Sequence, residues 1–435
     1  MRRPSTTIFL LMLWAGSSLA ATEIPRPDVA DAEERVRAKV RVSYARVAAH
    51  PDDGEAWGSY GMTLDAHRMN AAAVIAYEEA QRLDPKEFRW PYYLGSILEY
   101  EDPARALDWY QRAIDIDGDY APAQIRIAQT FEVLGDDDQA FRHFARAEAL
   151  DSTDPLAPFG RGRIVLSRGD PEGARRHLER AYSLDSEIQA VVATLARLYH
   201  QVGERDLARV KAAEARGLPR MTHHRDARRA AVRQQAVDTE SFLRRSKTYI
   251  EVGQLDSARR ELETLLALEP DLAEAHFSAA GVYDRLGQPR LALASARRTL
   301  ELDPELPGAR SVVAGALFKM QRLTEADAEA RRVLLDEADN FHMLMIVGMV
   351  AAENGDIAAM IDSLDRAFEV RSESSPLRGL LVQMYADLAD SFAAINDLDQ
   401  AAHRMSQALE VAQEMAQPRS KINDLQRRRD AYLKR

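Results

Sequence analysis

EAWGSYGMTLDAHRMNAAAVIAYEEAQRLDP, the stretch at residues 55–85, contains two helix-favouring runs on either side of a short polar turn, HRMN. The first run carries Gly61 and the second carries Ala73, with Tyr77 four places later. Two helices pack closely only where small side chains let their backbones approach, and larger residues then fill the remaining gaps. The stretch therefore predicts a pair of packed helices.

The same positions recur through the chain at intervals of about 34 residues, which indicates a repeat architecture. The small residue of the first helix recurs as Gly61, Gly95, Ala128, Gly162, Ala196, Ser246, Ala280, Ala314, Gly348 and Val382. The bulky residue of the second helix recurs as Tyr77, Tyr110, Phe144, Leu178, Leu262 and Leu364. No single pair can bury its apolar face alone, so we expect the pairs to be stable only as a stack.

Trp57, Tyr60, Gly61, Leu64 and the residues after them follow the pattern W-x2-L-G-x2-Y…A-x3-F…A…P, ending at Pro85. This pattern resembles the tetratricopeptide repeat. The resemblance implies an all-α, right-handed superhelical solenoid of about ten helix-turn-helix repeats. It also implies a concave groove that is lined by the first helix of each pair.

The repeat register predicts two lobes of five repeats each, interrupted by a short segment. The expected parts are a signal peptide at 1–20, an N-terminal capping helix within 21–53, lobe 1 at 54–222, an insertion at 223–238, lobe 2 at 239–415 and a basic C-terminal solvating helix at 416–435. The last repeat has about seven extra residues, close to two helical turns, and we expect its first helix to be longer while keeping its face. No remaining block is large enough for a separate catalytic domain.

The first twenty residues are typical of a cleaved secretory signal. Arg2 and Arg3 precede the apolar run IFLLMLW, and small residues at Ser18 and Ala20 favour cleavage before Ala21. The apolar run is too short to cross a bilayer, which needs about 20 residues. We therefore expect a protein of the bacterial periplasm or the medium, without a membrane span after cleavage.

Composition excludes several classes of function. The chain of 435 residues has 58 Lys and Arg against 69 Asp and Glu, a net charge of −11, which argues against broad nucleic-acid binding. It has no Cys, so disulfides and thiolate sites are absent. The motifs G-x-S-x-G, H-E-x-x-H and G-x-x-x-x-G-K-[ST] do not occur. The adjacent pair His223 and His224 would face different ways on a helix and so makes a poor metal pair. With the enzyme motifs missing as well, we expect no metal, no cofactor and no catalytic residue.

Candidate binding residues are those that the register places on the concave first-helix face. They are Met62, Tyr92, Ser96, Gln129, Phe159, Arg163, Arg197 and Lys247. The run FRWPYY at 88–93 concentrates aromatic residues and an Arg, which are frequent anchors of interfaces. Packing between helices is the competing interpretation of Trp90 and Tyr92. Arg163, Arg197 and Lys247 share one column and would form a basic stripe, or else an ordinary solvated face.

These features favour a non-catalytic adaptor of the bacterial envelope that holds an extended or acidic segment of a partner protein in the groove. The pathway, the partner's identity and the oligomeric state stay open. The alternative is a periplasmic polysaccharide-binding protein of an export system, in which Trp90, Tyr92 and Phe159 would stack on sugar rings beside Arg163. An enzyme with a catalytic group hidden in the groove is the third and weakest interpretation.

Overall fold

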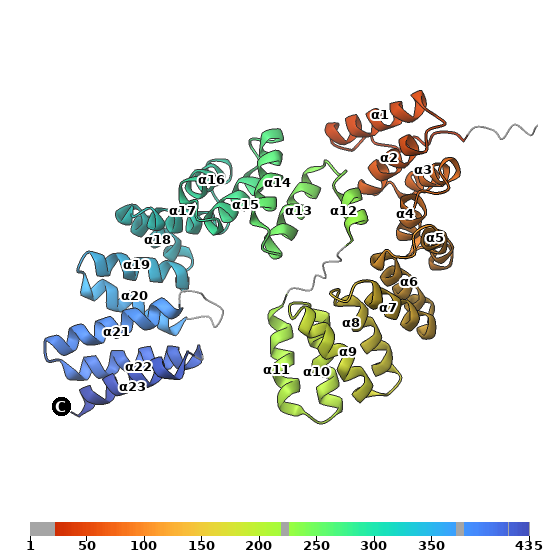
Figure 1. Ribbon diagram of the computed structural model, residues 1–435. Helices are drawn as coiled ribbons and strands as arrows, with labels where there is room; N and C mark the ends of the chain where they lie inside the picture. Colours follow the sequence, from red (N-terminus) through yellow and green to blue (C-terminus); the bar gives the residue numbers. More distant parts are fainter. Residues whose placement is uncertain (1–21, 219–225, 371–377, 416, 435) are drawn as a thin grey trace, which may run out of the picture. The chain divides into compact units, whose positions relative to one another are not determined.

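The computed structural model describes residues 22–218, 226–370, 378–415 and 417–434, and these residues form helices and turns without a β-strand (Figure 1). The chain divides into two compact units, unit 1 ending at Asp238 and unit 2 beginning at Thr239. In each unit successive helices pack as five pairs, which stack on one another in chain order. The prediction of an all-α array of about ten helix pairs is therefore confirmed.

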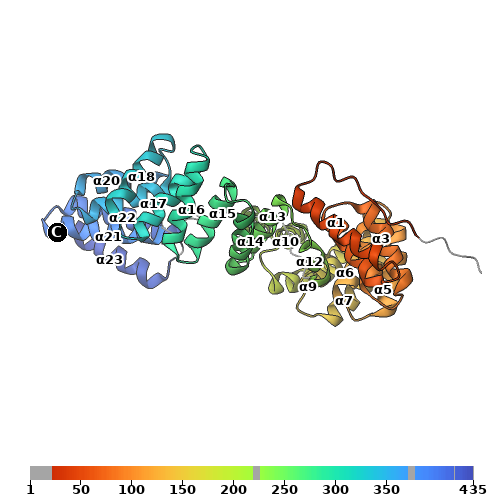
Figure 2. The same ribbon diagram turned by 90° about the horizontal axis from the view of Figure 1, so that it is seen from above.

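Unit 1 consists of one leading helix, five pairs and a short final helix (Figures 1 and 2). The leading helix is α1 (Glu34–Ala49), and the pairs are α2 (Gly54–Ala66) with α3 (Asn70–Leu83), α4 (Arg89–Leu98) with α5 (Pro103–Ile116), α6 (Ala121–Leu134) with α7 (Asp137–Leu150), α8 (Leu156–Ser167) with α9 (Pro171–Leu184) and α10 (Gln189–Gln201) with α11 (Arg205–Gly217). The final helix is α12 (Ala227–Arg233).

Unit 2 consists of five pairs and a C-terminal helix that packs on the last of them. The pairs are α13 (Thr239–Glu251) with α14 (Leu255–Leu268), α15 (Ala273–Arg285) with α16 (Pro289–Leu302), α17 (Ala309–Lys319) with α18 (Leu323–Asp336), α19 (Phe341–Glu353) with α20 (Ile357–Glu369) and α21 (Arg378–Ala394) with α22 (Leu398–Glu414), followed by α23 (Arg419–Leu433). Both α21 and α22 have 17 residues. The first helix of the last repeat is therefore longer, as expected, and the second helix is longer as well, which keeps the pair matched in length.

The turns inside the pairs show why these residues end one helix and start the next. Gly135 ends α6 with φ of 78°, a left-handed conformation that costs glycine little. The side chain of Asp136 then accepts a hydrogen bond from the backbone N–H of Gln139 at 3.0 Å and caps α7. One glycine and one aspartate thus reverse the chain within two residues.

The small first-helix residues of unit 1 lie where the sequence pattern predicts close packing. A Cβ atom at Gly61 would lie 2.6 Å from the ring of Tyr77, and one at Gly95 would lie 2.5 Å from the ring of Tyr110. Both distances are below the 3.0 Å that real Cβ atoms keep from their neighbours, so any side chain at these positions would force the rings to shift. The buried rings belong to a core in which Tyr77 stacks on Trp90 with centroids 6.1 Å apart.

Candidate functional site

The first-helix face of unit 1 is where sequence analysis places most of the candidate binding residues, and several of them are buried. Tyr92 is fully buried, and Met62, Ser96 and Phe159 are also buried. Trp90 is fully buried as well, with its ring against Gly58 and Tyr77. The rings that would stack on a sugar are therefore covered in this structure.

The helix α12 lies against this face, on the inner side of the arc of pairs in unit 1 (Figure 1). It packs on α2, and its Val232 is buried in the same core as the aromatic rings of α2, α3 and α4. Sequence analysis expects an insertion at 223–238 between two lobes. The structure shows that its described part folds back onto the first pairs of unit 1.

Asp226 fixes the start of α12 to unit 1. Its carboxylate accepts hydrogen bonds from the hydroxyl of Tyr92 at 2.5 Å and the hydroxyl of Tyr120 at 3.0 Å. It also accepts one from Nε of Arg126 at 3.2 Å, and it caps α12 through the backbone N–H of Arg229 at 2.9 Å. Four donors thus surround one buried carboxylate.

The charge state of Asp226 follows from these contacts. Burial alone would raise the pKa of Asp226, but the Arg126 guanidinium and the donors around the carboxylate hold the pKa below its ordinary value of 3.8. Burial also raises the pKa of Tyr92 well above its ordinary value, so its hydroxyl keeps its proton and acts as a donor. Nη1 of Arg126 in turn donates to both carboxylate oxygens of Glu99, at 2.9 and 3.0 Å.

Two arginines extend the attachment of α12. Arg229 makes a bidentate pair with Asp65 of α2 at 2.5 and 3.0 Å, and Asp65 also accepts from Tyr77 at 3.3 Å. The guanidinium of Arg228 lies over the ring of Phe88, 4.2 Å from its centroid. Planar, bidentate pairing of this kind gives orientation as well as affinity.

The end of the segment is held by His67. Its Nδ1 lies 2.7 Å from the carbonyl of Thr63, while Nε2 accepts from the backbone N–H of Val237 at 3.2 Å. These roles correspond to a neutral ring with the proton on Nδ1. Sequence analysis missed Asp226, Arg229 and His67, because contacts between residues more than a hundred positions apart leave no periodic signal.

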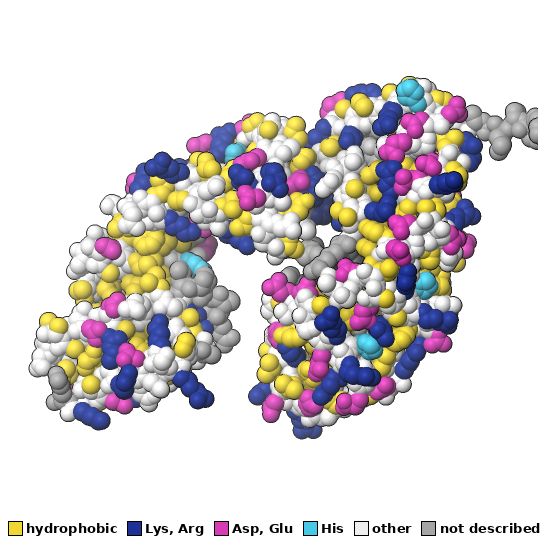
Figure 3. Space-filling model, in the orientation of Figure 1, with side chains coloured by type: hydrophobic (Ala, Val, Ile, Leu, Met, Phe, Trp, Pro, Cys, Tyr) yellow, Lys and Arg dark blue, Asp and Glu magenta, His cyan; other side chains and the backbone are white. Residues whose placement is uncertain are grey.

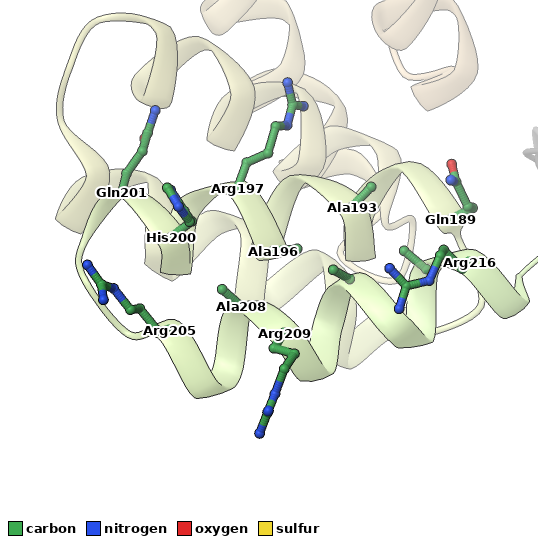
Figure 4. Close-up of a pocket in the computed structure, with 12 residues that line it drawn as sticks. Gln189, Ala193, Ala196, Arg197, His200, Gln201, Arg205, Ala208, Arg209 and Arg216 are labelled. Carbon is green, nitrogen blue, oxygen red and sulfur yellow. The ribbon is translucent and has the colours of Figure 1, made fainter.

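The three remaining candidate residues of unit 1 differ in exposure and in their partners. Arg163 pairs with Glu132 at 2.5 Å, and its guanidinium lies 5.3 Å from the centroid of the Phe159 ring. Gln129 is half-buried on α6. Arg197 is exposed and donates to the hydroxyl of Thr194 at 3.0 Å. Arg197 also lines a cavity of about 820 Å³ between α10 and α11 (Figure 4).

The first-helix face of unit 2 differs in its packing. Lys247 is exposed on α13, Phe277 and Met349 are half-buried, and Met345 is fully buried. Gly281 and Gly315 stand one place after the small-residue column, and a Cβ at either position would meet no other atom within 4 Å. The backbone of α15 and α17 is therefore open at these two points.

Over the described ranges, which omit His223 and His224, no cluster of three metal-ligating side chains is present. Within the same ranges no helix is long and apolar enough to cross a membrane. The expected signal peptide at 1–20 lies outside the described residues.

Comparison with known proteins identifies the repeat. Residues 243–307 match the family model described as tetratricopeptide repeat. BBSome complex member BBS4 of Xenopus tropicalis is 29% identical over 134 residues, which are 30% of this chain and 26% of that relative, so the match spans about a quarter of the relative's length.

Two solved structures illustrate the structural likeness. MamA is 19% identical over 37% of this chain and 89% of its own, with a TM-score of 0.35. PilF of Pseudomonas aeruginosa is 13% identical over 59% of this chain and 95% of its own, also with a TM-score of 0.35.

Proposed function

We propose that this chain, a tetratricopeptide repeat protein and so a protein–protein interaction scaffold, is a non-catalytic adaptor of a bacterial envelope assembly. In this proposal it holds a polypeptide segment of its partner against the first helices of its repeats.

The observation that carries the proposal is α12. This short helix is a polypeptide segment bound on the first-helix face of unit 1 through a buried carboxylate, Asp226, and a bidentate arginine, Arg229. The first-helix face of unit 1 therefore binds a polypeptide segment of the same chain, and the proposal requires such a face to bind a segment of another protein. Because α12 covers Tyr92, unit 1 offers little of this face to a partner, and unit 2 is the better candidate.

Unit 2 has the features that a bound segment needs. At Gly281 and Gly315 another backbone can approach the helices closely, as glycine allows. The half-buried Phe277 and Met349 of other first-helix positions in unit 2 supply adaptable apolar contacts, and Lys247 supplies a cation for an acidic segment. The envelope location is supported by the sequence of the first twenty residues, with Arg2 and Arg3 before an apolar run.

The proposal is tested by photo-crosslinking in cells. A photoreactive amino acid is placed at Gly315 in the full chain and, as the control, at Leu335, whose side chain is 84% exposed on α18. We expect one defined crosslinked partner from position 315 and none from position 335. Equal labelling from both positions, or no product from 315, would contradict the proposal.

The location is tested separately by cell fractionation and by the mass of the purified protein. We expect the chain in the periplasm, beginning at Ala21. A cytoplasmic chain that retains residues 1–20 would remove the envelope from the proposal and leave the scaffold function untouched.

A further inference from the structure

The last pair of unit 1 carries a cavity that extends from its first helix, α10, onto its second helix, α11. Twelve residues of α10 and α11 line this cavity of about 820 Å³ (Figure 4). Five of them are alanines, and four are arginines, Arg197, Arg205, Arg209 and Arg216. His200 and two glutamines complete the lining, which contains no carboxylate.

The four arginines of the cavity have few close carboxylate partners. Within the described part of the chain, no carboxylate lies within 4 Å of Arg205 or Arg216. Arg209 is 3.7 Å from Asp206, and both side chains are more than 80% exposed, so this pair is weak. Arg197 contacts the neutral hydroxyl of Thr194.

Two carboxylates, one just before α11 and one within it, have partners away from the cavity. Glu204 pairs with Arg175 of α9. Glu214 pairs with Lys211 at 2.7 Å and accepts from the hydroxyl of Tyr182 at 2.8 Å. Glu204 and Glu214 therefore lie toward the preceding pair, while the four arginines lie around the cavity.

The shape of this surface fits a helix. In unit 1 the second helix of each earlier pair packs against the first helix of the next pair, as α7 does with α8 and α9 with α10. The helix that follows α11 in unit 1 is α12, and it packs on α2 instead. The small residues Ala196 and Ala208 lie between α10 and α11, while Arg197 and Arg209 extend to opposite sides of them (Figure 4). A helix on this alanine floor would have cations along both edges.

We propose that the α10–α11 face docks an acidic amphipathic helix of a partner protein, with its small or apolar residues on the alanine floor and its carboxylates on the flanking arginines. Arg205 and Arg209 are one helical turn apart and Arg216 lies two turns further, a span of about 16 Å. An occupant of about 14 residues with Glu or Asp on both edges of its apolar stripe matches this spacing.

The test uses the full chain and a labelled synthetic helix of about 14 residues, with an alanine and leucine stripe flanked by glutamates. Fluorescence anisotropy should show saturable binding that weakens as salt is added. The triple variant Arg205→Glu, Arg209→Glu and Arg216→Glu should weaken this binding at least about tenfold. The same peptide with lysines in place of glutamates should not bind.

The matched control is Arg142→Glu, Arg176→Glu and Arg180→Glu, which changes the net charge equally on α7 and α9 and should leave binding unchanged. Circular dichroism must show that both triple variants keep their helix content. Failure of the glutamate peptide to bind, or equal binding by both variants, would overturn the proposal. Self-association abolished only by the first triple variant would assign the face to a second copy and would also overturn it. Crosslinking at Gly315 in unit 2 reports on the adaptor function independently.

Discussion

The two units build the same repeat with different uses of glycine. In unit 1, Gly58, Gly61 and Gly95 are crowded by the rings of Trp90, Tyr77 and Tyr110, so the missing side chain makes room for the protein's own core. In unit 2, Gly281 and Gly315 face open space. The comparison shows that a small residue on a first helix can serve either to close a helix pair or to leave backbone accessible.

Surface charge does not distinguish the two units. In the view of Figure 3, basic and acidic side chains are interspersed over both units. What separates the first-helix faces is what covers them, since α12 lies over that of unit 1 through the buried Asp226. The experiments below test this difference.

The largest effect is expected from Asp226→Ala. It removes the acceptor of Tyr92, Tyr120 and Arg126 and the cap of α12, and breaking a buried ion pair typically costs about 3 kcal/mol. Denaturant unfolding followed by Trp fluorescence measures this loss in the free energy of unfolding. The signal reports on unit 1, because Trp57, Trp90 and Trp109 all lie in unit 1 and unit 2 has no Trp. The control Asp271→Ala removes an exposed carboxylate of unit 2 and should leave this transition unchanged.

A smaller loss is expected from Gly61→Ala. The added Cβ would lie 2.6 Å from the buried ring of Tyr77, which cannot withdraw, and overpacking of this kind costs about 2 kcal/mol. The Trp-monitored unfolding midpoint should fall. An unchanged midpoint would mean that the assignment of the small-residue column to the packed side is wrong.

The same substitution in unit 2 should have the opposite sign. Gly315→Ala adds a Cβ that meets nothing within 4 Å, and alanine inside a helix is more stable than glycine by about 0.5–1 kcal/mol. Thermal unfolding followed by circular dichroism should shift upward. A downward shift would show that this face is packed against something that the structure does not show.

The smallest effect is a change with pH. Because the pKa of Asp226 is lower in the folded protein than in the unfolded chain, its contribution to stability is present above pH 3.8 and is lost as pH falls through the folded value. Asp226→Asn cannot titrate at this position. The stability difference between wild type and Asp226→Asn should therefore shrink below pH 4, and a difference independent of pH would exclude an ionised Asp226.

The repeated helix pairs could be predicted from the sequence, whereas α12 and its contacts, which occur once, could not. Recurring small and bulky residues identify the helix pairs, and Gly61 opposite Tyr77 is the contact that they imply. The register also places Tyr92 on the first-helix face, but a register cannot say what lies over that face. Tyr92 meets Asp226 across 134 residues of sequence, on a helix of only seven residues with no periodic partner. Of the four arginines that line the cavity of α10 and α11, the sequence pattern singled out only Arg197.

The attachment of α12 has a consequence for how unit 1 unfolds. A linear stack with contacts only between neighbours can fray from either end, one pair at a time. Here a segment that follows the fifth pair is fastened to α2 of the first pair by Arg229 and Asp65, which are 164 residues apart. The first pair can then open only when α12 is released, so amide protons of α2 and α12 should exchange in one cooperative event at similar rates.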